Sequence, residues 1–202
     1  MEKFTKLSGI AAPLMEANIN TDIIIPIKRL VGTERDTMGA FAFEPWRYLE
    51  EGVENPDFVL NREGYKDATI LIAGPNFACG SSREGAVWAL QGLGIKAVIA
   101  PSFGGIFFNN CFQSGLLPII LAPETVEDFA DRAGPDAEFT IDLENLTITP
   151  PNGMPVTFDV EGFRRTALLE GLDDVGMTMK RLGEIDAFQE ADKAKRPWIY
   201  AP

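Results

Sequence analysis

Residues 69–121 read TILIAGPNFACGSSREGAVWALQGLGIKAVIAPSFGGIFFNNCFQSGLLPIIL, and this stretch decides the fold. In it, short continuous apolar runs alternate with segments whose apolar residues have helical spacing. The predicted strands and helices follow in the order Thr69–Ala73, Arg83–Leu93, Ala97–Ala100, Phe103–Gly115 and Leu117–Leu121. Strands that are apolar throughout, with a helix after each, are typical of a mostly parallel central sheet flanked by helices. We therefore predict an α/β fold.

The flanking sequence adds a smaller β region and further helices. Downstream we predict a helix, a hairpin, a strand and a second helix, at Pro123–Ala133, 139–149, Val156–Val160 and Glu161–Glu170. Upstream we predict a buried strand, a mobile charged loop and a helical turn, at Ile23–Ile25, Lys28–Gly39 and Glu44–Glu51. We expect one domain over residues 1–202, with a polar tail from about residue 179 that is extended, helical or ordered only against a partner.

Composition excludes several classes of function. The chain has 202 residues, a net charge of −12, two cysteines and no histidine. An acidic surface repels phosphate, which disfavours nucleic acid and anionic membranes as partners. Without histidine the chain cannot build a Ser-His-Asp or Cys-His site. Two cysteines leave few soft ligands, which disfavours a zinc site, and they cannot hold an iron–sulfur cluster alone. The low cysteine count and the absence of a membrane-length apolar run lead us to expect a cytoplasmic protein.

The candidate site is the run Cys79-Gly80-Ser81-Ser82-Arg83-Glu84, which follows a predicted strand and opens a predicted helix. Free N–H groups and the dipole at such a helix start favour an anion, and an arginine can grip a carboxylate with two parallel hydrogen bonds. A second interpretation is structural, since Ser81 and Glu84 have the spacing of a helix capping box. The local pattern does not decide between these two interpretations.

The wider sequence resembles a known family. The stretch Gly74–Leu90 is similar to the signature of the small subunits of 3-isopropylmalate dehydratases, the detached swivelling domains of the aconitase superfamily. Further matching landmarks are Asn18–Asp22 with Ile24–Pro26, Asn55–Asn61, Val98–Phe103, Phe163–Arg165 and Gly171–Gly176. The resemblance implies the β/β/α swivelling fold of aconitases and a hydro-lyase that works only with a large subunit.

The resemblance also implies roles for individual residues. Ser81 corresponds to the base that exchanges the substrate's α-proton, and Asp22 belongs to the polar network of the active site. Ser82 and Arg83 bind a substrate carboxylate. Arg35, with Lys28 second, is the candidate for the far end of a small dicarboxylate substrate, although an ordinary solvated charge is an equal alternative. A turn-capping role is the alternative for Asp22.

The family places its cofactor on the other chain. The implied [4Fe–4S] cluster belongs to the large subunit, in a heterodimer or heterotetramer, and this chain is expected to bind no cofactor or metal. The implied reaction interconverts 2-isopropylmalate and 3-isopropylmalate in leucine biosynthesis. The alternatives are a related hydro-lyase acting on a citramalate- or homocitrate-type diacid, and a non-catalytic carboxylate-binding module.

Two positions depart from the family pattern. The family usually has histidine where this chain has Gly85 and Thr166. A glycine early in a helix costs about 1 kcal/mol relative to alanine. We expect Gly85 to leave space for a different substrate or for a side chain of the partner.

Overall fold

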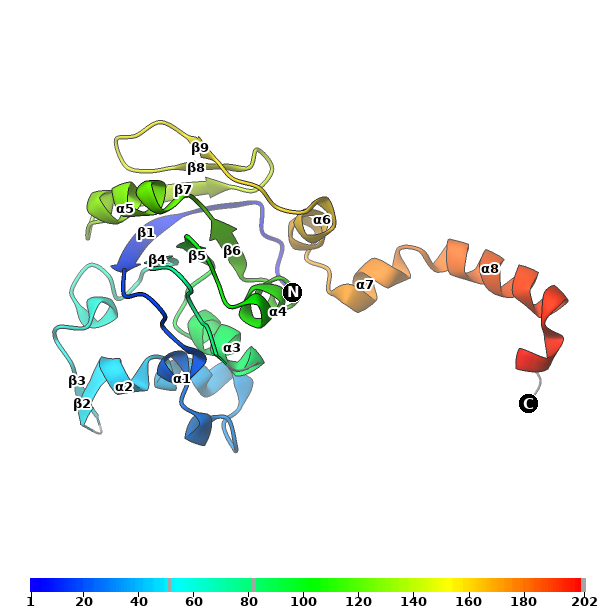
Figure 1. The fold of residues 1–202 in the computed structure, drawn as a ribbon, viewed down its shortest axis with the longest axis horizontal. Helices are drawn as coiled ribbons and strands as arrows, with labels where there is room; N and C mark the ends of the chain where they lie inside the picture. Colours follow the sequence, from blue (N-terminus) through cyan, green and yellow to red (C-terminus); the bar gives the residue numbers. More distant parts are fainter. Residues whose placement is uncertain (51, 81–82, 201–202) are drawn as a thin grey trace.

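The computed structural model describes residues 1–50, 52–80 and 83–200, and its centre is a seven-stranded sheet (Figure 1). The strand order is β6-β5-β4-β1-β7-β8-β9. Strands β6 (Leu117–Ile120), β5 (Ala97–Ala100), β4 (Ile70–Ala73) and β1 (Lys6–Leu14) pair in parallel. Strands β7 (Glu138–Asp142), β8 (Thr147–Thr149) and β9 (Val156–Thr157) continue the sheet with antiparallel pairing. The predicted α/β class, with a mostly parallel sheet and an added β region, is confirmed.

Helices cover both faces of this sheet. Side chains of β4 and β5 alternate between two cores, as the twofold period of a strand requires. Leu71 and Val98 pack into the core under α3 (Glu84–Gly92) and the start of α4 (Gly105–Ser114). Ile72 and Ile99 pack into the opposite core with α5 (Pro123–Arg132) and α6 (Gly162–Glu170). Burial on both faces explains why these strands are apolar throughout.

The central strand β1 was not predicted. Its sequence contains Gly9 and Pro13, which are unusual in the middle of a sheet. The register shows why Pro13 fits: pairing with β7 ends at Ile10, whereas pairing with β4 continues through Pro13 to Leu14. The missing N–H of Pro13 therefore leaves the β1–β7 ladder intact.

The N-terminal region differs from two further predictions. Ile23–Ile25 is not a strand, because Asn20 caps a short helix α1 (Thr21–Ile24) by accepting a hydrogen bond from the Ile23 backbone at 3.0 Å. The charged segment after it forms two 3₁₀ helices, η1 (Ile27–Arg29) and η2 (Arg35–Phe41). Then come α2 (Glu44–Arg47), a small hairpin of β2 (Tyr48–Glu50) and β3 (Val53–Glu54), and η3 (Val59–Asn61).

The segment η1–η2 is packed on α3 by a contact between two glycines. A β-carbon on Gly39 would lie 2.2 Å from the backbone carbon of Gly92, and one on Gly92 would lie 2.6 Å from the Gly39 nitrogen. Met38 beside them is buried. The segment predicted to be a mobile charged loop thus contains two 3₁₀ helices, and the second docks closely on α3 because glycine faces glycine at the contact.

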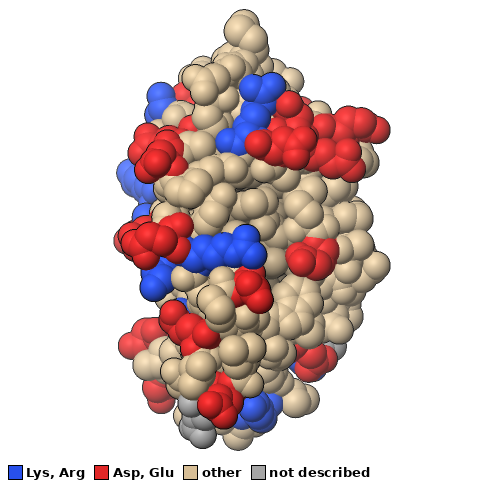
Figure 2. Space-filling model, turned by 90° about the vertical axis from the view of Figure 1, so that its left-hand side faces the viewer, with Lys and Arg blue, Asp and Glu red and all other residues tan. Residues whose placement is uncertain are grey.

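The C-terminal residues leave this body as an arm. Helix α7 (Asp174–Met179), helix α8 (Leu182–Lys195) and η4 (Pro197–Ile199) extend away from the sheet and end far from it (Figure 1). Among the residues described, no helix is long and apolar enough to cross a membrane. Acidic and basic side chains are interspersed on the face that Figure 2 shows, so charges of opposite sign lie beside one another there.

Candidate functional site

The site lies at the carboxyl end of β4, where three segments distant in sequence meet. Phe77 pairs with Phe103 beyond β5, and Cys79 pairs with Asn20 before α1. The Thr21 backbone donates to the Cys79 carbonyl at 3.0 Å, which fixes α1 against the turn after β4. Ligands of open parallel sheets bind at this edge. The fold thus places the predicted turn where a binding site is expected.

Strained backbone shapes this turn. Asn76, Ala78 and Gly80 all have positive φ angles, of 57°, 54° and 99°. Such angles are common for glycine and tolerated by asparagine, but they are costly for alanine. The Asn76 amide donates to the Asn18 side chain at 2.8 Å, and the Ser102 hydroxyl accepts from the Asn76 backbone at 2.8 Å. These contacts hold the turn in a conformation that the chain alone would not favour.

The structure brings Asp22 and Arg83 together. The Arg83 Nη1 donates to Asp22 Oδ1 at 2.5 Å, and it also reaches the Ile25 carbonyl at 3.5 Å. The Arg83 side chain is only 11% exposed, whereas that of Asp22 is 56% exposed. Within the described residues, Nε and Nη2 of Arg83 have no hydrogen-bond partner. That edge of the guanidinium is the one that binds a carboxylate with two parallel hydrogen bonds.

The start of α3 decides against the capping-box interpretation. The helix begins at Glu84, and Arg83 is its N-cap residue with no side-chain cap. A capping box would need Glu84 in the third position of the helix, whereas it occupies the first. Ser81 and Ser82, the predicted base and carboxylate ligand, lie outside the described residues. Their place directly before Arg83 is known from the sequence.

Gly85 has a structural explanation within this chain. A β-carbon at Gly85 would lie 2.5 Å from Cδ2 of Leu30 and 3.5 Å from the sulfur of Met38. The space above Gly85 is therefore filled by η1–η2 residues of the same chain. Our expectation that this space serves a substrate or a partner side chain is wrong for the chain as described here.

Lys28 is paired with a carboxylate of α2. Glu44 at the start of α2 accepts from Lys28 Nζ at 3.0 Å and from Arg29 at 2.8 and 3.0 Å. The Arg29 guanidinium, with Lys28 assisting, lowers the pKa of Glu44 to about 2. Arg29 also stacks 4.2 Å above the ring of Phe41. This cluster ties η1 to α2.

Arg35 lies toward the other end of α3 from Arg83. Its guanidinium is 5.1 Å from the centre of the Trp88 ring, and it donates to Gln91 at 3.4 Å. Along the helix, Gln91 is two turns beyond Arg83, a rise of about 12 Å. The structure therefore does not bring Arg35 to the Asp22–Arg83 pair, and its binding role stays a prediction.

The cysteines of this chain do not suit an iron–sulfur cluster. Cys111 is fully buried, and burial raises the pKa of its thiol well above the usual value, which disfavours the thiolate that a metal needs. Cys79 is half-buried and its sulfur faces the Asn18 carbonyl at 3.5 Å. No group of three potential metal ligands occurs among the residues described.

Sequence reasoning missed the framework of the site. It listed Asn18 and Asn20 as landmarks, but it did not assign the cap of α1 to Asn20 or the Asn18–Asn76 bond to the turn. The available signal was the asparagines themselves, since asparagine is favoured at helix N-caps, as at Asn20, and tolerates positive φ, as at Asn18 and Asn76.

Comparison with protein families and known proteins gives a consistent result. A family model described as the aconitase C-terminal domain matches residues 1–124, and one described as LeuD_N matches residues 130–162. The chain is 52% identical over 201 residues to the 3-isopropylmalate dehydratase small subunit of Dinoroseobacter shibae, covering 98% of this chain and 100% of that protein. It is 50% identical to the protein of the same name from Agrobacterium fabrum, covering 98% and 100% of the two chains.

A solved structure shares the fold. The crystal structure of a 3-isopropylmalate dehydratase from Methanocaldococcus jannaschii is similar with a TM-score of 0.67 and 30% sequence identity. The match covers 91% of this chain and 99% of that one.

Proposed function

This chain belongs to the family of 3-isopropylmalate dehydratase small subunits, and we propose that Asp22, Ser81, Ser82 and Arg83 form its half of the active site. The family activity is hydro-lyase chemistry in leucine biosynthesis, carried out together with a large subunit. The names of the relatives favour isopropylmalate over citramalate or homocitrate as the substrate. A cytoplasmic site of action is part of the same proposal.

The observation that carries the proposal is the free edge of Arg83. The guanidinium is nearly buried and is oriented through Nη1 by Asp22, and among the residues that the structure describes Nε and Nη2 have no partner, which leaves them for a ligand. A carboxylate bound there is held by charge-assisted hydrogen bonds, which are shorter and stronger than hydrogen bonds between neutral groups. Asp22 thus acts by orienting Arg83, and Arg83 orients the substrate.

Ser81 is proposed as the base that moves the α-proton. A serine hydroxyl has far too high a pKa to act alone in water. A positive charge two residues away in sequence, on Arg83, and the N-terminal end of α3 both favour the deprotonated form electrostatically. Ser82 is proposed to donate a hydrogen bond to the same substrate carboxylate as Arg83.

The large subunit is proposed to supply the Lewis acid of the reaction. A [4Fe–4S] cluster held by that subunit would provide the Lewis acid for the departing hydroxyl group. The contributions of this chain are limited to binding the carboxylate and handling the proton. Heterodimer and heterotetramer are the two proposed assemblies. Lys28 and Arg35 are proposed to contact the far end of the substrate, which requires them to leave Glu44 and Trp88.

The experiment is turnover of 2-isopropylmalate by the complex with the purified, cluster-loaded large subunit. We expect Ser81→Ala to lower kcat by about 10²-fold or more, the range for loss of a general base. Arg83→Lys keeps the positive charge but cannot form two parallel hydrogen bonds with a carboxylate. The KM for 2-isopropylmalate should therefore rise by about tenfold or more. Arg132→Lys, which alters an exposed pair with Asp128, is the matched control. Wild-type kinetics in both Ser81→Ala and Arg83→Lys would overturn the proposal.

A further inference from the structure

The C-terminal arm, residues 172–200, is too exposed to be stable by its own contacts. Asp192 is the buried residue of α8, and it is used within the arm to bind Arg196 at 2.7 Å and Tyr200 at 3.0 Å. An isolated helix of 14 residues is marginal in water. Large apolar side chains of the arm are nevertheless exposed: Val175, Met179, Leu182, Phe188, Trp198, Ile199 and Tyr200. Such a surface indicates a partner.

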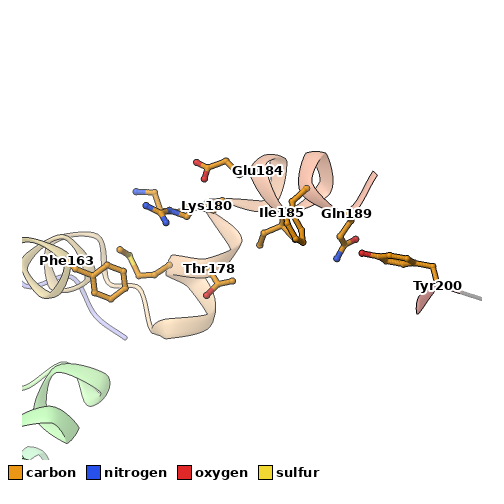
Figure 3. Close-up of a pocket in the computed structure, with 10 residues that line it drawn as sticks. Phe163, Thr178, Lys180, Glu184, Ile185, Gln189 and Tyr200 are labelled. Atoms are coloured by element: carbon orange, nitrogen blue, oxygen red, sulfur yellow. The ribbon is translucent and has the colours of Figure 1, made fainter. Parts of the chain in front are cut away.

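An open groove runs along this arm. It has a volume of about 880 Å³, and its lining extends from Phe163 on α6 past Ile185 to Tyr200 (Figure 3). Ile185 and Phe188 are three residues apart, so they lie on one face of α8 and both line the groove. The groove therefore offers an elongated apolar floor rather than an enclosed pocket for a small ligand.

Three exposed aromatic side chains beside the groove provide a large part of the area of a protein–protein interface. Phe163, Phe188 and Trp198 are 54%, 64% and 70% exposed. An aromatic side chain buries about 150–250 Å² in full, so these three expose roughly 350–400 Å² together. A stable interface buries about 800 Å² per partner. Three side chains thus provide nearly half of the area that a specific complex needs.

Helix α4 connects the arm to the candidate site. At its start, Gly104 packs closely on the turn after β4, residues 74–80, which we call the site turn. A β-carbon on Gly104 would lie 2.4 Å from the carbonyl oxygen of Ala78 in this turn. Further along, Asn109 accepts a hydrogen bond from Arg164 of α6 at 2.8 Å, and Gln113 donates one to Asp174 of α7 at 3.3 Å.

The exposed Ile106 lies one turn before Asn109, and the spacing of residues 106, 109 and 113 places them on one face of α4. This face runs from the site turn to the root of the arm. A protein that closes over the site turn therefore meets Ile106 and then the arm without a break.

We propose that the arm is a docking surface for the large subunit, which covers its groove with an apolar surface element. The inference rests on the proposed function, because it takes the chain that completes the site as the occupant. Continuity along α4 favours this occupant over a second copy of the small chain, whose contact would bear no relation to the site turn.

The test is the dissociation constant of the complex, measured by sedimentation velocity with purified large subunit and full-length small chain. We expect the double variant Phe188→Glu/Trp198→Glu to bind at least tenfold more weakly. Its kcat at saturating large subunit should stay within twofold of wild type, because the arm lies away from Asp22 and Arg83. Phe188→Leu, which keeps the apolar contact, should bind within about threefold of wild type.

Met154→Glu is the matched control, because Met154 is an apolar residue that is even more exposed, at 83%, and lies in the turn between β8 and β9, outside the arm. Its affinity should equal that of wild type. The proposal is overturned if the double variant binds as tightly as wild type, including the case in which only self-association of the small chain changes. If the wild-type complex forms but turns over no 2-isopropylmalate, the proposed function fails, while the difference in affinity still decides the docking surface.

Discussion

Asp22 and Arg83 are 61 positions apart in the sequence, yet they form an ion pair at 2.5 Å beside the turn after β4. The pair joins α1 to the start of α3. Asp22 is half exposed and Arg83 is nearly buried, so the pair orients a buried cation whose Nε and Nη2 have no partner among the residues described.

Asp22→Asn should raise KM for 2-isopropylmalate by about tenfold, because a charge-assisted hydrogen bond contributes roughly 1.5 kcal/mol to holding Arg83. The free energy of unfolding should fall by no more than about 1.5 kcal/mol, since asparagine can still accept a hydrogen bond from Arg83 and Asp22 is half exposed. Steady-state kinetics of the complex and urea unfolding of the chain measure the two quantities. Asp128→Asn, which breaks an exposed pair with Arg132, is the control. An unchanged KM would show that Asp22 does not orient the substrate-binding arginine.

Gly39→Ala should destabilise the chain by about 3 kcal/mol, at the upper end of the usual cost of overpacking. Its β-carbon would meet the backbone of Gly92 at 2.2 Å, and backbone cannot move aside as a side chain can. KM should rise as well, since η2 would lift from α3. Gly162→Ala in α6 is the control, because nothing lies within 4 Å of its β-carbon. Equal melting curves for the two variants would refute close docking of η2.

Gly85→His should destabilise the chain by about 1–3 kcal/mol, because the imidazole would occupy the position of Leu30. Gly85→Ala should be nearly neutral, since the gain in helix propensity of about 1 kcal/mol offsets a small rotation of the Leu30 side chain. A double-mutant cycle with Leu30→Ala measures the coupling. We expect Leu30→Ala to restore most of the stability lost in Gly85→His. Additive effects would show that Leu30 does not fill this space.

Glu44→Gln should reveal the pH dependence of the cluster with Lys28 and Arg29. The pKa of Glu44 is about 2 in the folded chain and about 4.3 in the unfolded one, so its stabilising effect is fully present above pH 4.3. That effect is lost as the pH falls from about 4.3 to 2. At pH 7 we expect wild type to exceed Glu44→Gln by about 1–2 kcal/mol, after allowance for solvent screening.

Urea unfolding of both proteins at pH 7, 5, 4 and 3 measures this difference in stability, which should shrink only at the two lowest values. Glu54→Gln serves as the control, since its exposed pair with Lys66 spans 3.9 Å. If the difference in free energy of unfolding between wild type and Glu44→Gln stays constant from pH 7 to 3, Arg29 does not lower the pKa of Glu44.

Much of the α/β body could be predicted because its signals are local. The strands β4, β5 and β6 lie within one residue of their predicted bounds, and Gly115 and Gly171 end α4 and α6 in the left-handed conformation. An apolar run of four residues buried on both faces has few other interpretations. The place of the candidate site run, between β4 and α3, was predictable for a similar reason, whereas the roles of its residues stay predictions.

The features that escaped prediction depend on contacts between distant residues. Strand β1 is held by β4 and β7, on both sides, and its own residues have little strand propensity. The run Ile23–Ile25 favours a strand by composition, but the cap of Asn20 and the bond from Thr21 to Cys79 turn it into a helix.

The sequence by itself determined the class of fold, the family and the place of the candidate site run between β4 and α3, because local periodicity and a contiguous motif carry that information. The tertiary structure decided that Asp22 reaches Arg83, that Leu30 lies over Gly85, and that Lys28 and Arg35 are engaged elsewhere. These relations arise when packing brings separate segments together. The loss of chain entropy on closing such long loops is offset only by the contacts of the folded chain. No local pattern records them.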